Sequence, residues 1–309
     1  MDFLELFFIS IGTLFVLVYT VKLTGFLKTL FPKTWYPLPH SFFTSLGEWA
    51  VITGGSDGIG KAYAFELAKH GMNIVIISRT LEKLKKVAKE IEETTGQQVK
   101  VIAADFTKDD IYKRIEENIQ GLNVGILVNN VGILSSTLPC RFLDTENIDT
   151  SITNVINCNM KSPVKMCKMI LPGMEKRQKG LILNLSSGLA YTPCPLFTIY
   201  SASKGFVERF SRGLQAEYKS KGIIIQCLTP FGVSTPMTNY QKPNFVTKTA
   251  GEFVKVSLEN IMVGDQTYGC IPHAILGWII WKIPLKILHS EVLQRKFLEY
   301  VNQRMKTFK

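Results

Sequence analysis

The chain has 309 residues, of which 46% are hydrophobic, and its formal net charge is +11. This length and apolar content exclude a disordered chain and suit one large α/β domain of roughly 250 residues with an appendage. The positive charge does not predict a nucleic-acid partner, because basic residues are mixed with acidic ones, as in 79–96, and the sequence lacks a basic stripe interleaved with aromatics.

The six cysteines bear on the redox compartment. They stand far apart in the sequence, with no C-x-x-C pair and no histidine at a zinc-binding spacing. We therefore expect reduced thiols in a domain that faces the cytosol, and no metal site.

The first thirty residues differ in composition from the rest. Leu6–Val21 is an uncharged apolar run, and a snorkelling Lys22 would extend it through Leu23–Leu27 to a length that spans a bilayer. Acidic residues precede this run and basic residues follow it: Asp2 and Glu5, then Lys22, Lys28 and Lys33. This order disfavours a cleaved signal peptide and predicts a membrane anchor over 1–30 with the globular domain in the cytosol. A buried amphipathic helix is the alternative, and 31–47 would be a linker.

From Glu48 onward, short β-branched runs alternate with segments of helical period. The expected strands are 49–53, 73–78, 99–104, 125–130, 180–185 and 223–228. Continuous apolar strands separated by charged helices predict an α/β fold over 48–268, with a single Rossmann-like, doubly wound parallel sheet and helices on both faces. Such sheets bind ligands at the carboxyl ends of their strands.

The first expected strand runs directly into TGGSDGIGKAY (53–63), where Gly54, Gly58 and Gly60 form a G-x-x-x-G-x-G loop before a helix. Glycines let the backbone approach a pyrophosphate, which the free N–H groups of a helix N-terminus can bind. Tight turns use the same residues, but the strand–loop–helix setting favours a dinucleotide site. After the second strand, Arg79 stands where an NAD enzyme usually has an acidic residue, so we expect NADP(H); a solvated arginine is the alternative.

Ser187, Tyr200 and Lys204 form a second cluster, within SSGLAYTPCPLFTIYSASK (186–204). Tyr200 and Lys204 lie one helical turn apart, so the ammonium would stabilise the phenolate and lower the tyrosine pKa from its usual value of about 10. The phenol could then donate and accept a proton, while Ser187 hydrogen-bonds and polarises a carbonyl oxygen. The spacing predicts ketone reduction with Tyr200 as the proton donor.

Together with NNVG (129–132) and Asn159, these motifs resemble the short-chain dehydrogenase/reductase family, in matching order over 48–260. The resemblance implies a catalytic set of Asn159, Ser187, Tyr200 and Lys204, in which Lys204 also holds the nicotinamide ribose and Asn159 positions a water that resupplies the proton. A helix-capping or core amide is the alternative for Asn159. The implied cofactor site comprises Gly54, Ser56, Asp57, Gly58, Ile59, Gly60, Arg79, Asp105, Asn129, Tyr200, Lys204 and Thr235.

One position departs from the family pattern. Many relatives have Pro-Gly after the sixth strand, whereas this chain reads TPFGVSTPM (229–237) and places Phe231 at the glycine position. We expect a stiffer loop there, and the position of Thr235 in the cofactor site depends on that loop.

The segments SRTLEKL, ADFTKDDIY, RQKGLILN and VSTPMT, with the N-terminal run, resemble membrane-bound members of the family that reduce 17-ketosteroids with NADPH. The resemblance implies a steroid substrate and a place in the endoplasmic reticulum membrane, with the catalytic domain facing the cytosol. The segments 189–197 and 236–245, which should cover the substrate, carry few charges and would fit an apolar polycyclic ketone. Two alternatives are a 3-ketoacyl-CoA reductase of fatty-acid elongation and a catalytically inactive nucleotide-binding scaffold, which the intact catalytic set disfavours.

The C-terminal region, 269–309, is apolar and basic. Its apolar stretch 273–288 is interrupted by Lys282 and Pro284. A lid, a membrane-surface helix and a homodimer contact are therefore all compatible with it.

Overall fold

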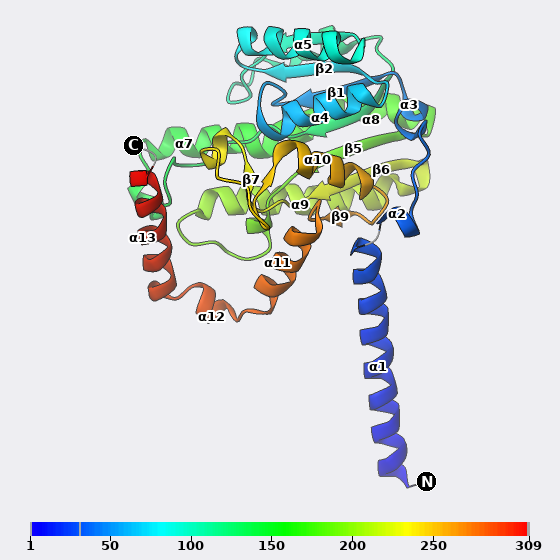
Figure 1. The fold of residues 1–309 in the computed structure, drawn as a ribbon, viewed down its shortest axis with the longest axis vertical. Coiled ribbons are helices and arrows are strands. Elements are labelled where there is room, and N and C mark those ends of the chain that lie inside the picture. Colours follow the sequence, from blue (N-terminus) through cyan, green and yellow to red (C-terminus); the bar gives the residue numbers. More distant parts are fainter. Residues whose placement is uncertain (1, 31, 308–309) are drawn as a thin grey trace.

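The computed structural model describes residues 2–30 and 32–307. At its centre lies a seven-stranded parallel sheet in the order β3-β2-β1-β4-β5-β6-β9, which confirms the expected doubly wound α/β fold (Figure 1). The strands are β1 (Trp49–Thr53), β2 (Asn73–Ser78), β3 (Val99–Ala103), β4 (Val124–Asn129), β5 (Gly180–Leu185), β6 (Ile223–Leu228) and β9 (Gln266–Thr267). The strand order reverses between β1 and β4, and this switch point is where doubly wound sheets bind their ligands.

Helices cover both faces of the sheet. Because side chains alternate along a strand, Ala50 and Ile52 of β1 pack in the core of one face and Val51 packs in the core of the other. The first face carries α4 (Gly58–Lys69), α5 (Leu81–Thr95) and α10 (Ala250–Glu259). The second carries α6 (Tyr112–Ile119), α8 (Ser162–Arg177) and α9 (Thr198–Tyr218). This double cover explains why the strands read as continuous apolar runs.

Helix α7 (Ile148–Val155) leads into α8 through a π-helical turn, Ile156–Lys161. Beyond β6, the short strands β7 (Val233–Ser234) and β8 (Lys248–Thr249) pair with each other in parallel. The C-terminal region forms α11 (Ile271–Lys282), α12 (Leu285–Leu288) and α13 (Glu291–Thr307), which descend from the β9 edge and turn back beside the domain (Figure 1).

The N-terminal helix α1 (Phe3–Leu30) stands away from the domain (Figure 1). Its segment Phe3–Gly25 has a mean hydropathy of 2.1 and is long and apolar enough to cross a membrane. Every side chain from Asp2 to Gly25 is exposed, so the alternative of a helix buried in the domain is wrong. Two short helices follow, α2 (Pro32–Trp35) and α3 (Phe42–Leu46), and α3 buries Phe43 and Leu46 in the core. The expected linker therefore ends inside the folded domain.

Candidate active site

The glycine-rich loop joins β1 to α4. Gly54 and Gly58 have φ angles of 69° and 54°, in the left-handed region that favours glycine. Asp57 caps α4, because its Oδ1 accepts a hydrogen bond from the Gly58 N–H at 2.7 Å. A Cβ atom at Gly60 would lie 2.2 Å from the Gly54 carbonyl oxygen. Gly60 therefore acts through close packing of the helix against the loop, and it does not line the cavity described next.

A cavity of about 1170 Å³ lies along the carboxyl ends of the strands. The expected cofactor residues that line it are Gly54, Ser56, Asp57, Gly58, Ile59, Arg79, Asp105, Tyr200, Lys204 and Thr235. Ligand pockets usually measure about 300–1000 Å³, so this cavity has room for a dinucleotide and a second molecule together. The bare glycine loop at the start of α4 and the size of the cavity both fit a nicotinamide dinucleotide.

One end of the cavity is polar and basic. The Ser56 and Ser78 hydroxyls lie 3.0 Å apart, and the exposed side chains of Arg79 and Lys83 line the cavity beside them. Lys83 was not among the expected site residues; it lies in the first turn of α5, which begins two residues after Arg79. Asp105, which follows β3, accepts hydrogen bonds from the backbone N–H and hydroxyl of Thr107 at 3.1 and 3.0 Å.

The structure does not bring Asn129 to the cavity. Asn129 is 5% exposed inside the sheet, where its side-chain amide donates to the Asn184 side-chain oxygen at 2.8 Å. Its neighbour Asn130 lines the cavity instead, and the Asn130 amide donates to the carbonyl oxygens of Thr53 and Gly54 at 3.0 and 3.2 Å. Of these two neighbours Asn130 is the one that faces the cavity, because successive side chains of an extended chain point to opposite sides.

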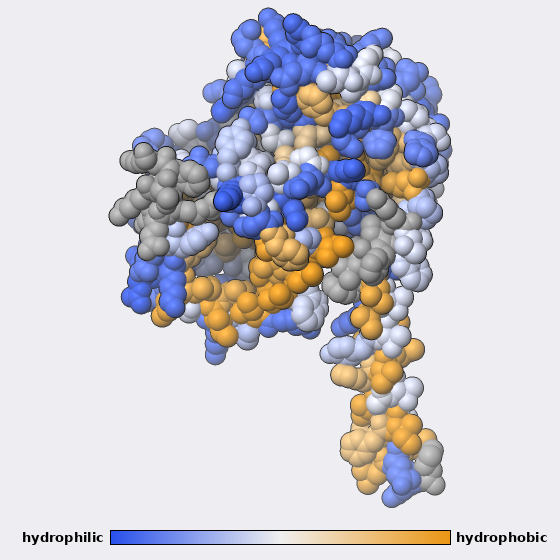
Figure 2. Space-filling view, viewed as in Figure 1, coloured by the Kyte–Doolittle hydropathy of each residue, from blue (hydrophilic) through white to orange (hydrophobic). Residues whose placement is uncertain are grey.

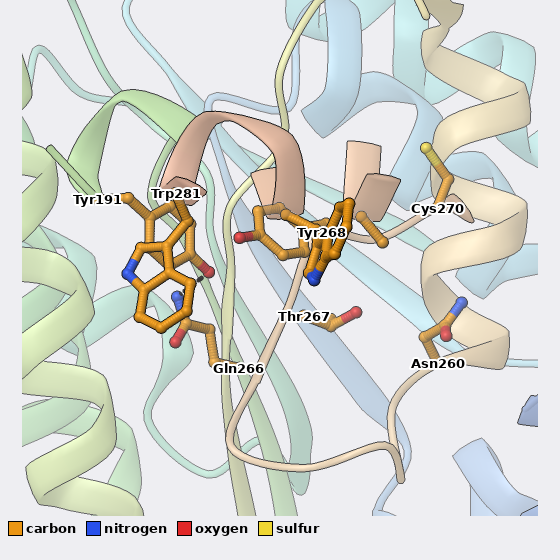
Figure 3. A pocket seen from close by; sticks show the side chains of 9 residues that line it. Tyr191, Asn260, Gln266, Thr267, Tyr268, Cys270 and Trp281 are labelled. Carbon is orange, nitrogen blue, oxygen red and sulfur yellow. Dashed lines mark hydrogen bonds between the residues drawn. The ribbon is translucent and has the colours of Figure 1, made fainter. Parts of the chain in front are cut away.

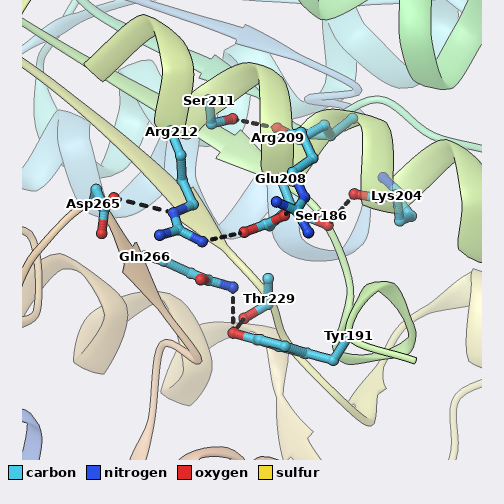
Figure 4. Close-up of polar contacts among 11 residues, drawn as sticks. Ser186, Tyr191, Lys204, Glu208, Arg209, Ser211, Arg212, Thr229, Asp265 and Gln266 are labelled. Atoms are coloured by element: carbon cyan, nitrogen blue, oxygen red, sulfur yellow. Dashed lines mark hydrogen bonds and ion pairs between the residues drawn. The ribbon is translucent and has the colours of Figure 1, made fainter. Parts of the chain in front are cut away.

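Ser187, Tyr200 and Lys204 meet at the middle of the cavity. Ser187 follows β5, and its hydroxyl is hydrogen-bonded to Tyr200 of α9. The Lys204 ammonium donates to the Leu185 carbonyl oxygen at 2.8 Å and lies 5.8 Å from the centre of the Tyr200 ring. The Ser186 hydroxyl donates to the Lys204 backbone carbonyl at 2.6 Å, which ties α9 to the end of β5 (Figure 4).

Burial sets the protonation states of this cluster. Loss of solvation raises the pKa of Tyr200 to about 12, although its hydrogen bond with Ser187 acts in the opposite direction. The expectation that Lys204 lowers this pKa below 10 is wrong for this structure, where loss of solvation outweighs the hydrogen bond with Ser187. Burial also lowers the pKa of Lys204 to about 8. At neutral pH, Tyr200 therefore holds its proton and most Lys204 side chains remain charged.

Asn159 lies in the π-helical turn and is 1% exposed. Its side-chain oxygen accepts from the Ile133 N–H at 2.8 Å, and its amide donates to the Ile133 carbonyl and to the Ser203 hydroxyl at 2.9 and 3.0 Å. Ser203 in turn donates to the Tyr200 carbonyl at 2.7 Å. Asn159 does not line the cavity, so in this geometry it fixes the loop at Ile133 against the helix that carries Tyr200.

Phe231, the departure from the family pattern, packs against the catalytic loop. A Cβ atom at Gly188 would lie 2.4 Å from the Phe231 ring, so a glycine next to Ser187 is what makes room for this ring. The Phe231 N–H also donates to Nδ1 of the buried His273 at 3.3 Å. Thr235 still reaches the cofactor end, because a Cβ atom at Gly58 would lie 3.1 Å from its methyl carbon.

The opposite end of the cavity is apolar. It is lined by Leu134 and Phe197, by Leu276 of α11, and by Phe297, Tyr300 and Val301 of α13. The rings of Phe197 and Phe297 lie 6.2 Å apart, which brings α13 across the start of α9. Phe197 brings this end to the catalytic groups, because its ring lies 6.5 Å from the ring of Tyr200, so a substrate bound here would meet them.

Known proteins share both this fold and this order of motifs. Residues 48–244 match the short chain dehydrogenase family. A 17-beta-hydroxysteroid dehydrogenase type 3 of Danio rerio is 59% identical over 304 residues, which cover 98% of this chain and 99% of that protein. A very-long-chain 3-oxoacyl-CoA reductase of Anas platyrhynchos is 51% identical over 77% of each chain.

A solved structure supports the same assignment. The bulky-bulky ketone specific alcohol dehydrogenase of Comamonas testosteroni superposes with a TM-score of 0.65 at 27% identity, and the match covers 84% of this chain and 94% of that one. The chain therefore belongs to the short-chain dehydrogenase/reductase family, and it is an oxidoreductase with a nicotinamide cofactor.

Proposed function

We propose that this enzyme reduces the 17-ketone of androstenedione to the 17β-hydroxyl of testosterone, with NADPH as the reductant. The observation that carries the proposal is the apolar end of the cavity beyond Tyr200. Among the described residues that line the cavity, the basic ones are Arg79, Lys83 and Lys204, and none lies at the apolar end. Near full-length identity to 17-beta-hydroxysteroid dehydrogenases type 3 supports the same substrate.

The choice of NADPH rests on the basic end of the cavity. Ser56, Arg79 and Lys83 would hold a 2′-phosphate, because a guanidinium, an ammonium and a hydroxyl together offer charge-assisted hydrogen bonds to it. The N–H group at Ile59 would hold the pyrophosphate at the start of α4, whereas the Gly58 N–H already donates to Asp57. Lys204 would hold the nicotinamide ribose.

The chain's own residues would divide the chemistry among them. The bound cofactor supplies the hydride that the carbonyl carbon receives. The Ser187 oxygen accepts from the Leu189 N–H at 3.2 Å, and its hydroxyl, which is hydrogen-bonded to Tyr200 in this structure, would donate to the carbonyl oxygen of a bound substrate. Tyr200 gives its proton to that oxygen as negative charge develops there. The charged Lys204, held by the Leu185 carbonyl, stabilises the phenolate that remains.

The protonation of Tyr200 suits reduction. A phenol with a pKa of about 12 is protonated at neutral pH, as a proton donor must be. The reverse reaction would need a phenolate, which is scarce under the same conditions. Asn159 would help to resupply the proton only indirectly, by fixing the loop at Ile133 that borders the site of a water near Lys204, because its side chain is already bonded to Ile133 and Ser203.

The competing substrate class is a 3-oxoacyl-CoA, since relatives with that named activity are about as similar over three quarters of the chain. A CoA carries phosphates that would need basic partners at the apolar end. The test is a parallel assay of the full chain in membranes with NADPH and either androstenedione or a 3-oxoacyl-CoA. We expect rapid reduction of the steroid and little of the thioester; the opposite ratio would refute the substrate and leave the oxidoreductase class intact.

We further propose that 1–30 anchors the enzyme in the endoplasmic reticulum membrane, that 48–268 is the NADP-binding domain and that it faces the cytosol. Asp2 and Glu5 precede the apolar part of α1, whereas Lys22 and Lys28 follow it, as the positive-inside tendency requires. A glycosylation acceptor placed before Asp2 should be modified in microsomes, and one in an exposed loop of the domain should not. Protection of the domain from added protease in intact microsomes would overturn this topology.

A further inference from the structure

An exposed apolar surface lies on α11 and α12, and we call it the α11–α12 face. On α11, Ile275, Trp278, Ile279 and Trp281 are 37%, 56%, 45% and 63% exposed. The same helix packs its buried residues His273, Ala274 and Gly277 against the domain. Monomeric soluble proteins rarely expose such a contiguous apolar patch, and a patch of this kind usually marks an interaction site.

The composition of the α11–α12 face matches the interface between lipid and water. Tryptophans are enriched at this depth because the ring is amphipathic, and lysines reach past them toward the headgroups. Lys282 lies over the ring of Trp281, 5.1 Å from its centre, and the exposed Lys286 follows between Leu285 and Ile287 of α12. Short apolar helices with basic residues at their edges are typical of segments that lie in a membrane surface.

The α11–α12 face also points in the direction in which α1 leaves the domain. Figure 1 shows α1, α11 and α12 beneath the β9 edge of the sheet, with the β3 edge at the far end. In Figure 2, hydrophobic residues cover the helices of this underside as well as α1. A bilayer that holds α1 therefore lies on the side to which this face is turned.

The face is recessed beneath its tryptophans. A cavity of about 270 Å³, separate from the catalytic cavity, is lined by Trp278 and Trp281, by the stacked rings of Tyr191 and Tyr268, and by Gln266 (Figure 3). The Tyr191 hydroxyl is engaged with Thr229 and Gln266 (Figure 4). The recess thus offers aromatic walls that suit a lipid acyl chain.

Helix α11 connects this face to the catalytic cavity. Its Leu276 lines that cavity, while its neighbour Ile275 points outward. His273 at the start of α11 accepts from the Phe231 N–H and bonds the Val246 carbonyl at 2.9 Å, so α11 is fixed to the loops that border the cofactor end. A displacement of α11 would therefore change both the α11–α12 face and the lining of the catalytic cavity.

From these observations we propose that the α11–α12 face docks in the headgroup region of the same membrane that α1 spans, with lipid as its partner. Docking places the apolar end of the catalytic cavity, at Leu276 and α13, next to the bilayer. An apolar ketone dissolved in the membrane then reaches the active site without crossing water. This consequence holds for any membrane-soluble ketone and does not rest on the steroid assignment.

Tryptophan fluorescence tests the docking directly, because the chain has only four tryptophans. The full chain with Trp35→Phe and Trp49→Phe keeps only Trp278 and Trp281. It is reconstituted in phosphatidylcholine nanodiscs, one chain per disc, with bromine near the glycerol end of the acyl chains. We expect strong loss of emission compared with unbrominated lipid. A chain that keeps only Trp49, in β1, is the matched control and should not be quenched.

The alternatives give different results. If Trp278 and Trp281 stay unquenched by bromolipid and accessible to an aqueous quencher, the proposal is overturned. If they become shielded from the aqueous quencher only in discs with two chains, the face is a homodimer contact and the proposal fails as well.

A kinetic experiment uses the outward residues of α11, which do not line the catalytic cavity. The Ile275→Glu, Ile279→Glu variant should raise the KM for a membrane-dissolved ketone and leave the KM for NADPH and the kcat unchanged. The Ile275→Leu, Ile279→Leu variant should behave as wild type. Unchanged KM for the ketone in the folded glutamate variant would refute the delivery of substrate from the bilayer.

Discussion

Replacement of Tyr200 by phenylalanine removes the proposed proton donor and keeps the ring. Because general acid catalysis contributes about 10²- to 10⁴-fold, the kcat for ketone reduction should fall by that factor, or by about 3 to 5 kcal/mol in activation free energy. The folded state loses only the hydrogen bond between Tyr200 and Ser187, which is worth about 0.5–1.5 kcal/mol. The affinity for NADPH should stay nearly unchanged, since the Lys204 ammonium keeps its bond to the Leu185 carbonyl.

Three measurements check this prediction on the full chain: steady-state reduction of the ketone, NADPH binding by fluorescence, and thermal unfolding. Tyr191→Phe is the matched control, because Tyr191 is a partly buried tyrosine whose hydroxyl makes hydrogen bonds, to Thr229 and Gln266, outside the catalytic cavity. This control should retain turnover. A folded Tyr200→Phe enzyme that binds NADPH and keeps most of its turnover would refute the assignment of the proton donor.

Three further predictions follow from the site. Burial lowers the pKa of Lys204 to about 8, so its charged form is lost as the pH rises through that value. The kcat for reduction should therefore be level below pH 8 and fall above it. A kcat that rises through this range would contradict the role of the ammonium. Arg79→Asp should raise the KM for NADPH by about 10- to 150-fold, since a charge-assisted contact is worth about 1.5–3 kcal/mol, and should change the KM for NADH little. Lys85→Asp, which lies outside the cavity, should leave the KM for NADPH unchanged. Gly60→Ala should destabilise the fold by about 1–3 kcal/mol, because the added Cβ atom would meet the Gly54 loop. Gly213→Ala is the control and should stabilise α9 by about 0.5–1 kcal/mol, because the space around Gly213 is open. Equal melting temperatures for the two variants would argue against the packing role of Gly60.

Most of the sheet could be predicted from the sequence. The six longer strands are buried on both faces, so each appears as an uninterrupted β-branched run such as NIVIIS, and the observed bounds agree to within one residue. Strand β9 could not be found this way, because Gln266 and Thr267 are only two residues with no period of their own. They become a strand through their pairing with Cys227 and Leu228 of β6, which is a tertiary effect.

The meeting of Ser187, Tyr200 and Lys204 at one cavity could also be predicted from the sequence, since Tyr200 and Lys204 share a helix face and Ser187 follows a strand. Which of Asn129 and Asn130 lines the cavity could not be predicted from the sequence, because it depends on the side of the sheet to which each side chain points. The sign of the Tyr200 pKa shift was wrong for a related reason. The spacing to Lys204 can be read along a helix, whereas the depth of burial comes from segments as distant as α13 and the loop at Phe231.

Transfer of a labelled hydride from NADPH shows directly whether the enzyme reduces the 17-ketone. The full chain in membranes is incubated with androstenedione and NADPH that carries deuterium at the transferable position of the nicotinamide, and the steroid is analysed by mass spectrometry. We expect testosterone with one deuterium at C17, formed by the wild-type enzyme and not by the Tyr200→Phe variant. Androstenedione recovered without reduction, while a 3-oxoacyl-CoA takes up the label in a parallel incubation, would contradict it.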